Sequence, residues 1–119
     1  MTSVIKYITF DCHDPQALAL FWSAALGYEI VNWDNFDAAL SQAADGHLPR
    51  LAFIKVPEGK TVKNRLHLDV EPSGTTMEAD VERLVGLGAS RIEQFDEPYG
   101  TWTVMADPEG NEFCVASPE

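Results

Sequence analysis

The amino-acid sequence repeats one order of predicted elements, and this duplication constrains the fold more than any other feature of the chain. One amphipathic stretch ends at Leu26 and Gly27 in the first half, and another ends at Leu87 and Gly88 in the second half. A glycine directly after an apolar stripe of helical spacing is a common helix end. Strand-like segments flank both stretches in the same order, so the sequence predicts two similar modules.

In the first half, residues 4–11 alternate loosely between apolar and polar side chains and are rich in β-branched and aromatic types, which favours a strand. Asp14 can cap the helix that follows, and Pro15 suits the first turn of that helix. Apolar residues then recur at helical spacing up to Leu26. Two more strands are predicted at residues 28–33 and 49–56, and residues 35–44 fit either a strand or a short helix.

In the second half, residues 65–70 predict a strand that opens the repeat. Met77 and Leu84 belong to the apolar face of a second helix, which is expected to stop at Gly88. Three strands are predicted after this helix, at residues 91–95, 101–106 and 112–116.

A strand, a helix and three strands, given twice, predict an α+β protein of two tandem βαβββ modules that curl around a shared cleft. We expect a single domain over residues 1–119, with module 1 at about 1–57, a linker at about 58–64 and module 2 at about 65–119. Side chains alternate along a strand, so every second residue would face the cleft. A concave surface of this kind is the usual place for a small ligand.

The charge of the chain excludes one class of partner. The sequence has 8 Lys+Arg against 19 Asp+Glu, a formal net charge of −11, whereas a nucleic-acid-binding surface needs clustered cations. The same acidity disfavours an anionic membrane surface, and no apolar run reaches the roughly 20 residues of a membrane helix. We therefore expect a cytoplasmic protein with no nucleic-acid or membrane partner. Cys12 and Cys114 are far apart and are expected to be free thiols.

Three segments carry a resemblance to a known family: FWSAALGY at residues 21–28, NRLHLDV at 64–70 and DPEGNEF at 107–113. Together they resemble the vicinal oxygen chelate superfamily, which includes glyoxalase I, bleomycin-resistance proteins and extradiol dioxygenases, and most closely its glyoxalase-like domain members. The resemblance covers both modules. It implies the glyoxalase/bleomycin-resistance fold, a small-molecule ligand and a homodimer, but not one reaction, because one fold hosts many functions.

The resemblance also bears on metal binding. In metal-dependent members the ligands come from the first and last strands of each module, and the corresponding positions here are Tyr7, Ile54, Arg65 and Cys114. Of these only Cys114 would ligate readily, and a buried Arg65 would repel a cation. We therefore expect no metal cofactor. A shift of register by one or two residues would instead bring in His67 or Glu112 as ligands.

His67 is the candidate catalytic acid or base, because imidazole exchanges protons near neutral pH and Asp69 lies two residues away on the same predicted strand face. Arg65 on that face could receive a ligand carboxylate or phosphate. The alternative is structural: His67 and Asp69 could tie strands together, and Arg65 could pair with an acidic residue. The predicted ligand-binding residues are Tyr7, Thr9, Ile54, Arg65, Asp69, Trp102, Glu112 and Cys114.

Three functions follow from these residues and the resemblance. The first is a glyoxalase-like protein that binds a small organic molecule, either as a metal-independent lyase or isomerase or without catalysis. The second is a drug-sequestering protein of the bleomycin-resistance type, suggested by the charge of −11, because an acidic groove attracts cationic compounds. The third is a metal-dependent glyoxalase or dioxygenase, which would need His67 or Glu112 as ligands.

Overall fold

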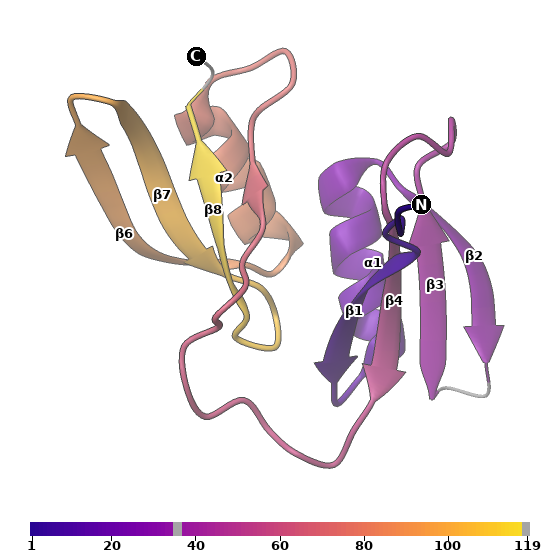
Figure 1. The fold of residues 1–119 in the computed structure, drawn as a ribbon. Helices are drawn as coiled ribbons and strands as arrows, with labels where there is room; N and C mark the ends of the chain where they lie inside the picture. The colour runs from indigo at the N-terminus through magenta and orange to yellow at the C-terminus, as the bar shows by residue number, and fades with distance from the viewer. Residues whose placement is uncertain (35–36, 118–119) are drawn as a thin grey trace. The chain divides into compact units, whose positions relative to one another are not determined.

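The computed structural model describes residues 1–34 and 37–117. The chain forms two compact units, Met1–Gly59 (unit 1) and Lys60–Glu119 (unit 2). Each unit contains a strand, a helix and three further strands, in that order (Figure 1). The predicted α+β class and the repeated βαβββ order are confirmed.

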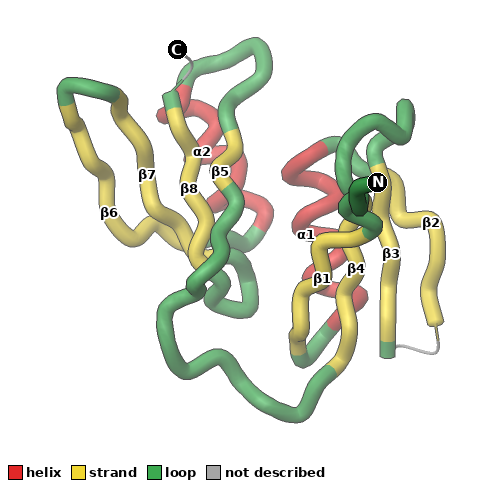
Figure 2. Tube along the Cα trace, in the orientation of Figure 1, coloured by secondary structure: helices red, strands yellow, loops and turns green. Residues whose placement is uncertain are grey.

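Unit 1 is a four-stranded mixed sheet with one helix on its face (Figures 1 and 2). The strand order in the sheet is β1-β4-β3-β2; β1 and β4 are parallel, and the other neighbours are antiparallel. The elements of unit 1 are β1 (Tyr7–Cys12), α1 (Pro15–Leu26), β2 (Glu29–Asp34), β3 (Ala38–Gln42) and β4 (Arg50–Lys55).

Unit 2 repeats this topology with the order β5-β8-β7-β6, and again its first and last strands form the parallel pair. Helix α2 contacts β6 and β8, and Figure 2 shows it behind the sheet. The elements of unit 2 are β5 (Asp69–Val70), α2 (Met77–Leu87), β6 (Ser90–Glu97), β7 (Gly100–Ala106) and β8 (Glu112–Ala116).

Helix α1 begins and ends where its local signals predict. The Asp14 carboxylate accepts a hydrogen bond from the backbone N–H of Ala17 at 3.1 Å, and Pro15 is the first helical residue. Gly27 ends the helix with φ of 72°, a left-handed conformation that glycine adopts without steric cost. The helix places Leu18 and Trp22 in the core of unit 1, where both are at most 1% exposed.

An aromatic cluster fills the core of unit 1. The ring of Phe10 on β1 lies 5.5 Å from that of Trp22 and 5.2 Å from that of Phe53 on β4. Because side chains alternate along a strand, Phe10 on the helix side places Tyr7 and Thr9 on the other face of the sheet. Both are more exposed than the core residues.

The turn between β7 and β8 is organised by one buried carboxylate. Asp107 is 3% exposed and its Oδ1 accepts the backbone N–H groups of Glu109 and Asn111 at 2.9 and 3.0 Å. The side-chain amide of Asn111 donates to both of its oxygens. The fixed turn sets the register in which β8 runs back along β7.

The structure differs from the predicted elements in three places. The strand predicted over residues 65–70 is only Asp69 and Val70, the two residues that lie in register with β8. Strand β1 begins at Tyr7, where its partner β4 begins, and not at residue 4. The uncertain segment 35–44 contains a strand, β3, while residues 35 and 36 lie outside the described residues.

Candidate functional site

A pocket of about 710 Å³ lies on the face of the unit 2 sheet that points away from α2. Phe113 and Val115 of β8 are buried on the helix side, so Glu112, Cys114 and Ala116 between them point to the opposite face. The described residues that line the pocket are Lys63, His67, Asp69, Tyr99, Gly100, Thr101, Trp102, Val104, Glu112, Cys114, Ala116 and Ser117.

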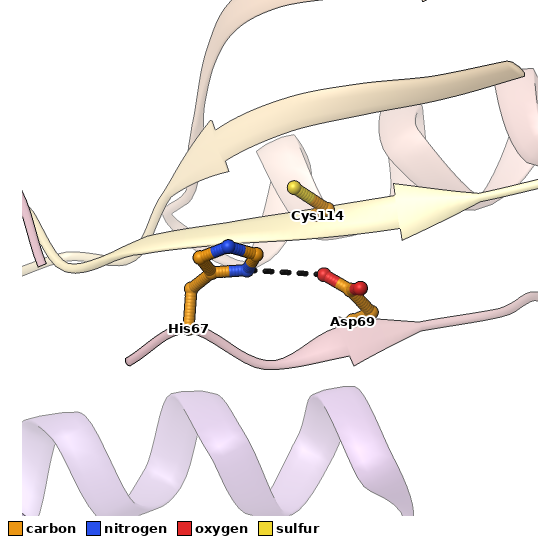
Figure 3. Close-up of side chains that lie close together, drawn as sticks. All are labelled: His67, Asp69 and Cys114. Atoms are coloured by element: carbon orange, nitrogen blue, oxygen red, sulfur yellow. Dashed lines mark hydrogen bonds and ion pairs between the residues drawn. The ribbon is translucent and has the colours of Figure 1, made fainter. Parts of the chain in front are cut away.

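His67 and Asp69 form a hydrogen-bonded pair at one side of this pocket (Figure 3). The Nδ1 atom of His67 lies 3.1 Å from Oδ1 of Asp69. An ionised carboxylate only accepts hydrogen bonds, so Nδ1 must carry the proton. In neutral His67, Nε2 is then the atom with the free lone pair, and it is available to accept a proton from a bound molecule.

Cys114 faces the same pair from β8. Asp69 and Cys114 are register neighbours in the parallel β5–β8 ladder. The ligating atoms of His67, Asp69 and Cys114 all lie within 4.8 Å of one another (Figure 3). Burial raises the pKa of the Cys114 thiol, and the nearby Asp69 carboxylate raises it further by its charge and a hydrogen bond. Cys114 is therefore a protonated thiol at neutral pH in the protein alone.

Glu112 is held by two donors at the base of the pocket. Its Oε1 accepts the backbone N–H of Asn64 at 2.9 Å, and its Oε2 pairs with Lys60 Nζ at 3.0 Å. The Asn64 N–H lowers the pKa of Glu112, and Lys60 contributes in the same direction. Because protein groups engage both oxygens, Glu112 mainly fastens residues 60–64 to β8.

A cluster of three aromatic rings contributes two of its members, Trp102 and Tyr99, to the wall of the pocket. Trp102 on β7 lies between Phe95 of β6, at 5.5 Å and 20°, and Tyr99 of the hairpin turn, at 5.9 Å and 26°. Trp102 and Tyr99 both line the pocket, and Tyr99 is 81% exposed. A planar or apolar group of a ligand could pack against these rings.

Five of the predicted site residues are among the described residues that line this pocket. His67, Asp69, Trp102, Glu112 and Cys114 all line it. Arg65 is exposed and is not one of the described lining residues. Tyr7, Thr9 and Ile54 belong to unit 1, on β1 and β4. The predicted cleft shared by the two modules stays a prediction.

Seven of the described lining residues were not among the predicted site residues, and Lys63 and Tyr99 are the charged and the aromatic side chain among them. Lys63 precedes β5 in a segment without regular structure, so no periodicity pointed to it. Tyr99 had a signal in the sequence: it lies in the two-residue turn between Glu97 and Gly100, close to Phe95 and Trp102, which are cross-strand partners on β6 and β7. Aromatic residues at that spacing on a tight hairpin can stack.

Two mixed four-stranded sheets, each made from a βαβββ unit, and a ligand-sized pocket on one of them fit the vicinal oxygen chelate superfamily, to which the matching family model assigns the chain. The glyoxalase-like domain family model matches residues 7–116, so the chain belongs to that family. No protein of curated function matches the chain.

Solved structures show the same fold at low sequence identity. A glyoxalase/bleomycin resistance protein/dioxygenase family enzyme from Burkholderia phytofirmans PsJN has 17% identity and a TM-score of 0.76, over 96% of this chain and 98% of its own. A glyoxalase-related enzyme from Fulvimarina pelagi has 22% identity and a TM-score of 0.71, over 97% and 88%. A mutant fosfomycin resistance protein FosX from Listeria monocytogenes, complexed with Mn(II) and 1S,2S-dihydroxypropylphosphonic acid, has 14% identity and a TM-score of 0.77, over 100% and 93%.

Within the described residues, no helix is long and apolar enough to cross a membrane.

Proposed function

We propose that the chain binds a small organic molecule in the unit 2 pocket and acts on it as a metal-independent lyase or isomerase, with His67 as the acid–base group. The observation that carries the proposal is the His67–Asp69 hydrogen bond at the wall of a 710 Å³ pocket. A volume of this size accommodates a small organic ligand. The aromatic rings of Trp102 and Tyr99 supply apolar surface for its body.

The chemistry follows from the position of the protons. With Nδ1 bonded to Asp69, Nε2 of His67 can take a proton from carbon next to a carbonyl group and return it to the neighbouring atom. Asp69 fixes the orientation of the imidazole and stabilises its cationic form after the transfer. Cys114 keeps its proton because burial raises its pKa, and it contributes shape and not a nucleophile.

Proton abstraction can be tested without knowing the natural substrate. A panel of α-hydroxy and α-keto carbonyl compounds is incubated with the protein in deuterated buffer, and exchange of the carbon-bound proton is followed by NMR. We expect the wild type to catalyse this exchange, and we expect the exchange rate of the variant His67→Gln to be at least about a hundredfold lower. The matched control is His13→Gln, an exposed histidine of unit 1, which should exchange like the wild type. Equal exchange in His67→Gln and wild type would contradict the acid–base role.

The non-catalytic alternative predicts binding without exchange, seen as chemical shift changes of pocket residues alone.

The charges at the pocket do not favour a cationic drug. Of the two acidic lining residues, Glu112 is neutralised by Lys60, and Lys63 offsets Asp69. The negative charge of the chain is therefore not concentrated at this site.

A second candidate function rests on the approach of three potential metal ligands. His67, Asp69 and Cys114 offer an imidazole, a carboxylate and a thiol within 4.8 Å of one another. This donor set fits a borderline ion such as Zn²⁺ better than Mn²⁺, which prefers oxygen. Such an ion would act as a Lewis acid on a substrate oxygen, and Cys114 would have to lose its proton to hold it.

Metal content separates the two candidates. Purified protein is analysed for bound metal and then titrated with Co²⁺, whose absorption spectrum reports a thiolate ligand. The metal-independent proposal expects less than one tightly bound ion per chain and no thiolate band. One ion per chain, with a thiolate band that Cys114→Ser removes, would favour the second candidate.

A homodimer, implied by the resemblance, is tested separately by light scattering.

A further inference from the structure

A second and smaller pocket, of about 420 Å³, lies in unit 1 where β1 and β4 begin and β3 ends. It is separate in sequence from every residue of the unit 2 pocket. The described residues that line it are Ile5, Lys6, Gln42, Gly46, His47, Leu48, Pro49 and Arg50.

The charge of this pocket is opposite to that of the chain. Lys6 and Arg50 line it together with His47, and none of its described lining residues is acidic. Neither Lys6 nor Arg50 forms an ion pair with the described side chains of residues 1–31 and 37–117. Two un-neutralised cations in one pocket are not expected from a composition of 8 basic and 19 acidic residues.

The Arg50 guanidinium is held in place by an aromatic ring. Its Cζ lies 4.6 Å from the ring centroid of Tyr7, its register neighbour on β1. Lys6 Nζ lies 5.8 Å from the same centroid. A guanidinium near a ring still presents its N–H groups as a planar fork, which can donate in parallel to two oxygens of an anion.

The rim of the pocket is also ordered. The backbone N–H of Gly46 donates to Ala43 O at 3.1 Å, and Gly46 has a φ of 71° that suits a tight turn. The Tyr28 hydroxyl donates to Pro49 O at 3.1 Å, which fastens the segment before β4. Little conformational entropy would therefore be lost when a ligand enters.

Two carboxylates lie near this pocket: Glu29 on β2, the register partner of Gln42, and Asp45 in the rim. Asp45 accepts a hydrogen bond from the backbone N–H of His47 at 3.0 Å. Burial is the main cause of the raised pKa of Tyr28, and the negative charge of Asp45 is the second cause. Neither carboxylate is a described lining residue, whereas Lys6 and Arg50 both line the pocket, so the charges that face a ligand there are positive.

We propose that this pocket of unit 1 is an anion-binding site that takes a phosphate-type oxyanion, with Arg50 as the bidentate donor and Lys6 as the second cation. Ile5, Leu48 and Pro49 give the pocket an apolar side, so a phosphate monoester fits it better than inorganic phosphate. The site is independent of the function proposed for unit 2, since it shares no residue with that pocket.

Titrations followed by amide NMR test the proposal with named probes. Inorganic phosphate, methyl phosphate, phenyl phosphate and sodium chloride are added separately to the full chain at constant ionic strength. We expect saturable shifts centred on Gly46, His47 and Arg50, with phenyl phosphate binding most tightly. Free phosphate as the natural ligand predicts instead that inorganic phosphate binds as tightly as either ester. The proposal fails if chloride produces the same shifts, or if no phosphate compound saturates by about 20 mM.

Variants separate a built site from general attraction to cations. Arg50→Ala should weaken phosphate binding at least about tenfold, and Arg50→Lys should recover only part of it, because Lys cannot donate as a fork. Lys6→Ala, an exposed residue whose loss does not threaten folding, should weaken binding severalfold. The matched control is Lys55→Ala, at the other end of β4, with unchanged affinity. Equal affinity for Lys6→Ala and Arg50→Ala proteins and the wild type would overturn the assignment.

Discussion

The imidazole of His67 and the carboxylate of Asp69 are hydrogen-bonded at 3.1 Å, and one residue separates them in sequence. Residues two apart on a regular strand point the same way, but a short strand leaves their spacing adjustable. Here β5 starts at Asp69, so His67 lies just outside the ladder and can turn its ring toward the carboxylate. The hydrogen-bonded pair therefore depends on β5 beginning only at Asp69, which leaves His67 outside the strand.

Removal of the Asp69 charge should make Cys114 more reactive. Burial and Asp69 both raise the pKa of this thiol, so Asp69→Asn lowers it while burial still holds it above the ordinary value. The thiolate is the reactive form, and we expect alkylation at pH 8 to accelerate severalfold. The measurement is the pH dependence of the iodoacetamide rate in a Cys12→Ser background. Glu71→Gln, an exposed carboxylate of the same unit, should leave the rate unchanged.

Replacement of Glu112 should cost stability at neutral pH but not in acid. Its folded pKa lies below the ordinary value, so the ionised carboxylate stabilises the fold above that ordinary value and loses the effect as pH falls through the folded pKa. Glu112→Gln should unfold about 1 kcal/mol more easily at pH 7. Urea unfolding at pH 7 and at pH 3 checks this. The same difference at both pH values would contradict it, and Glu97→Gln serves as the exposed control.

Trp102 should matter more for binding than for folding. It is partly exposed and stacks between Phe95 and Tyr99, so its ring is part of the pocket wall. Trp102→Ala should weaken the tightest carbonyl compound of the exchange panel by at least about tenfold, whereas Trp102→Phe keeps a stacking surface and most of the affinity. Calorimetric titration gives the affinities. Ile92→Ala, an exposed apolar residue of β6, is expected to bind like the wild type.

Asp107 should be among the most sensitive positions for stability. Its buried carboxylate accepts the N–H groups of Glu109 and Asn111 and the side-chain amide of Asn111. Asp107→Ala leaves these donors without their acceptor and should cost about 2–3 kcal/mol. The change is measured by urea unfolding beside Glu82→Ala, which removes an exposed carboxylate from α2. A loss no larger than that of the control would contradict the structural role.

Local signals predicted the helices well. Asp14, Pro15 and Gly27 act within one turn of the backbone, so the bounds of α1 could be read from the sequence. The extent of β5 could not, because it is set by how far β8 runs beside it, and β8 is more than forty residues away along the chain.

The site was predicted only in part, because local signals reach only those of its residues that are near one another in sequence. His67 and Asp69 are near in sequence, and their pairing was foreseeable. Lys63 and Tyr99 enter the pocket through the path of a loop and the stacking of a hairpin, which depend on tertiary contacts. Arg65 shows the converse: a regular strand would have placed it beside His67, but the segment is irregular there and the side chain is exposed.

The parallel pairing of β5 with β8 has a consequence for how the chain acquires its site during synthesis. Cys114 meets Asp69 only after the intervening helix and hairpin have been made, because the first strand of unit 2 pairs with its last. Strand pairing over that separation is slow compared with helix or hairpin formation, because the entropy of loop closure is lost before the long-range contacts form. The pocket is therefore completed last in unit 2, because a nascent chain that lacks β8 lacks Glu112, Cys114 and Ala116 of its lining.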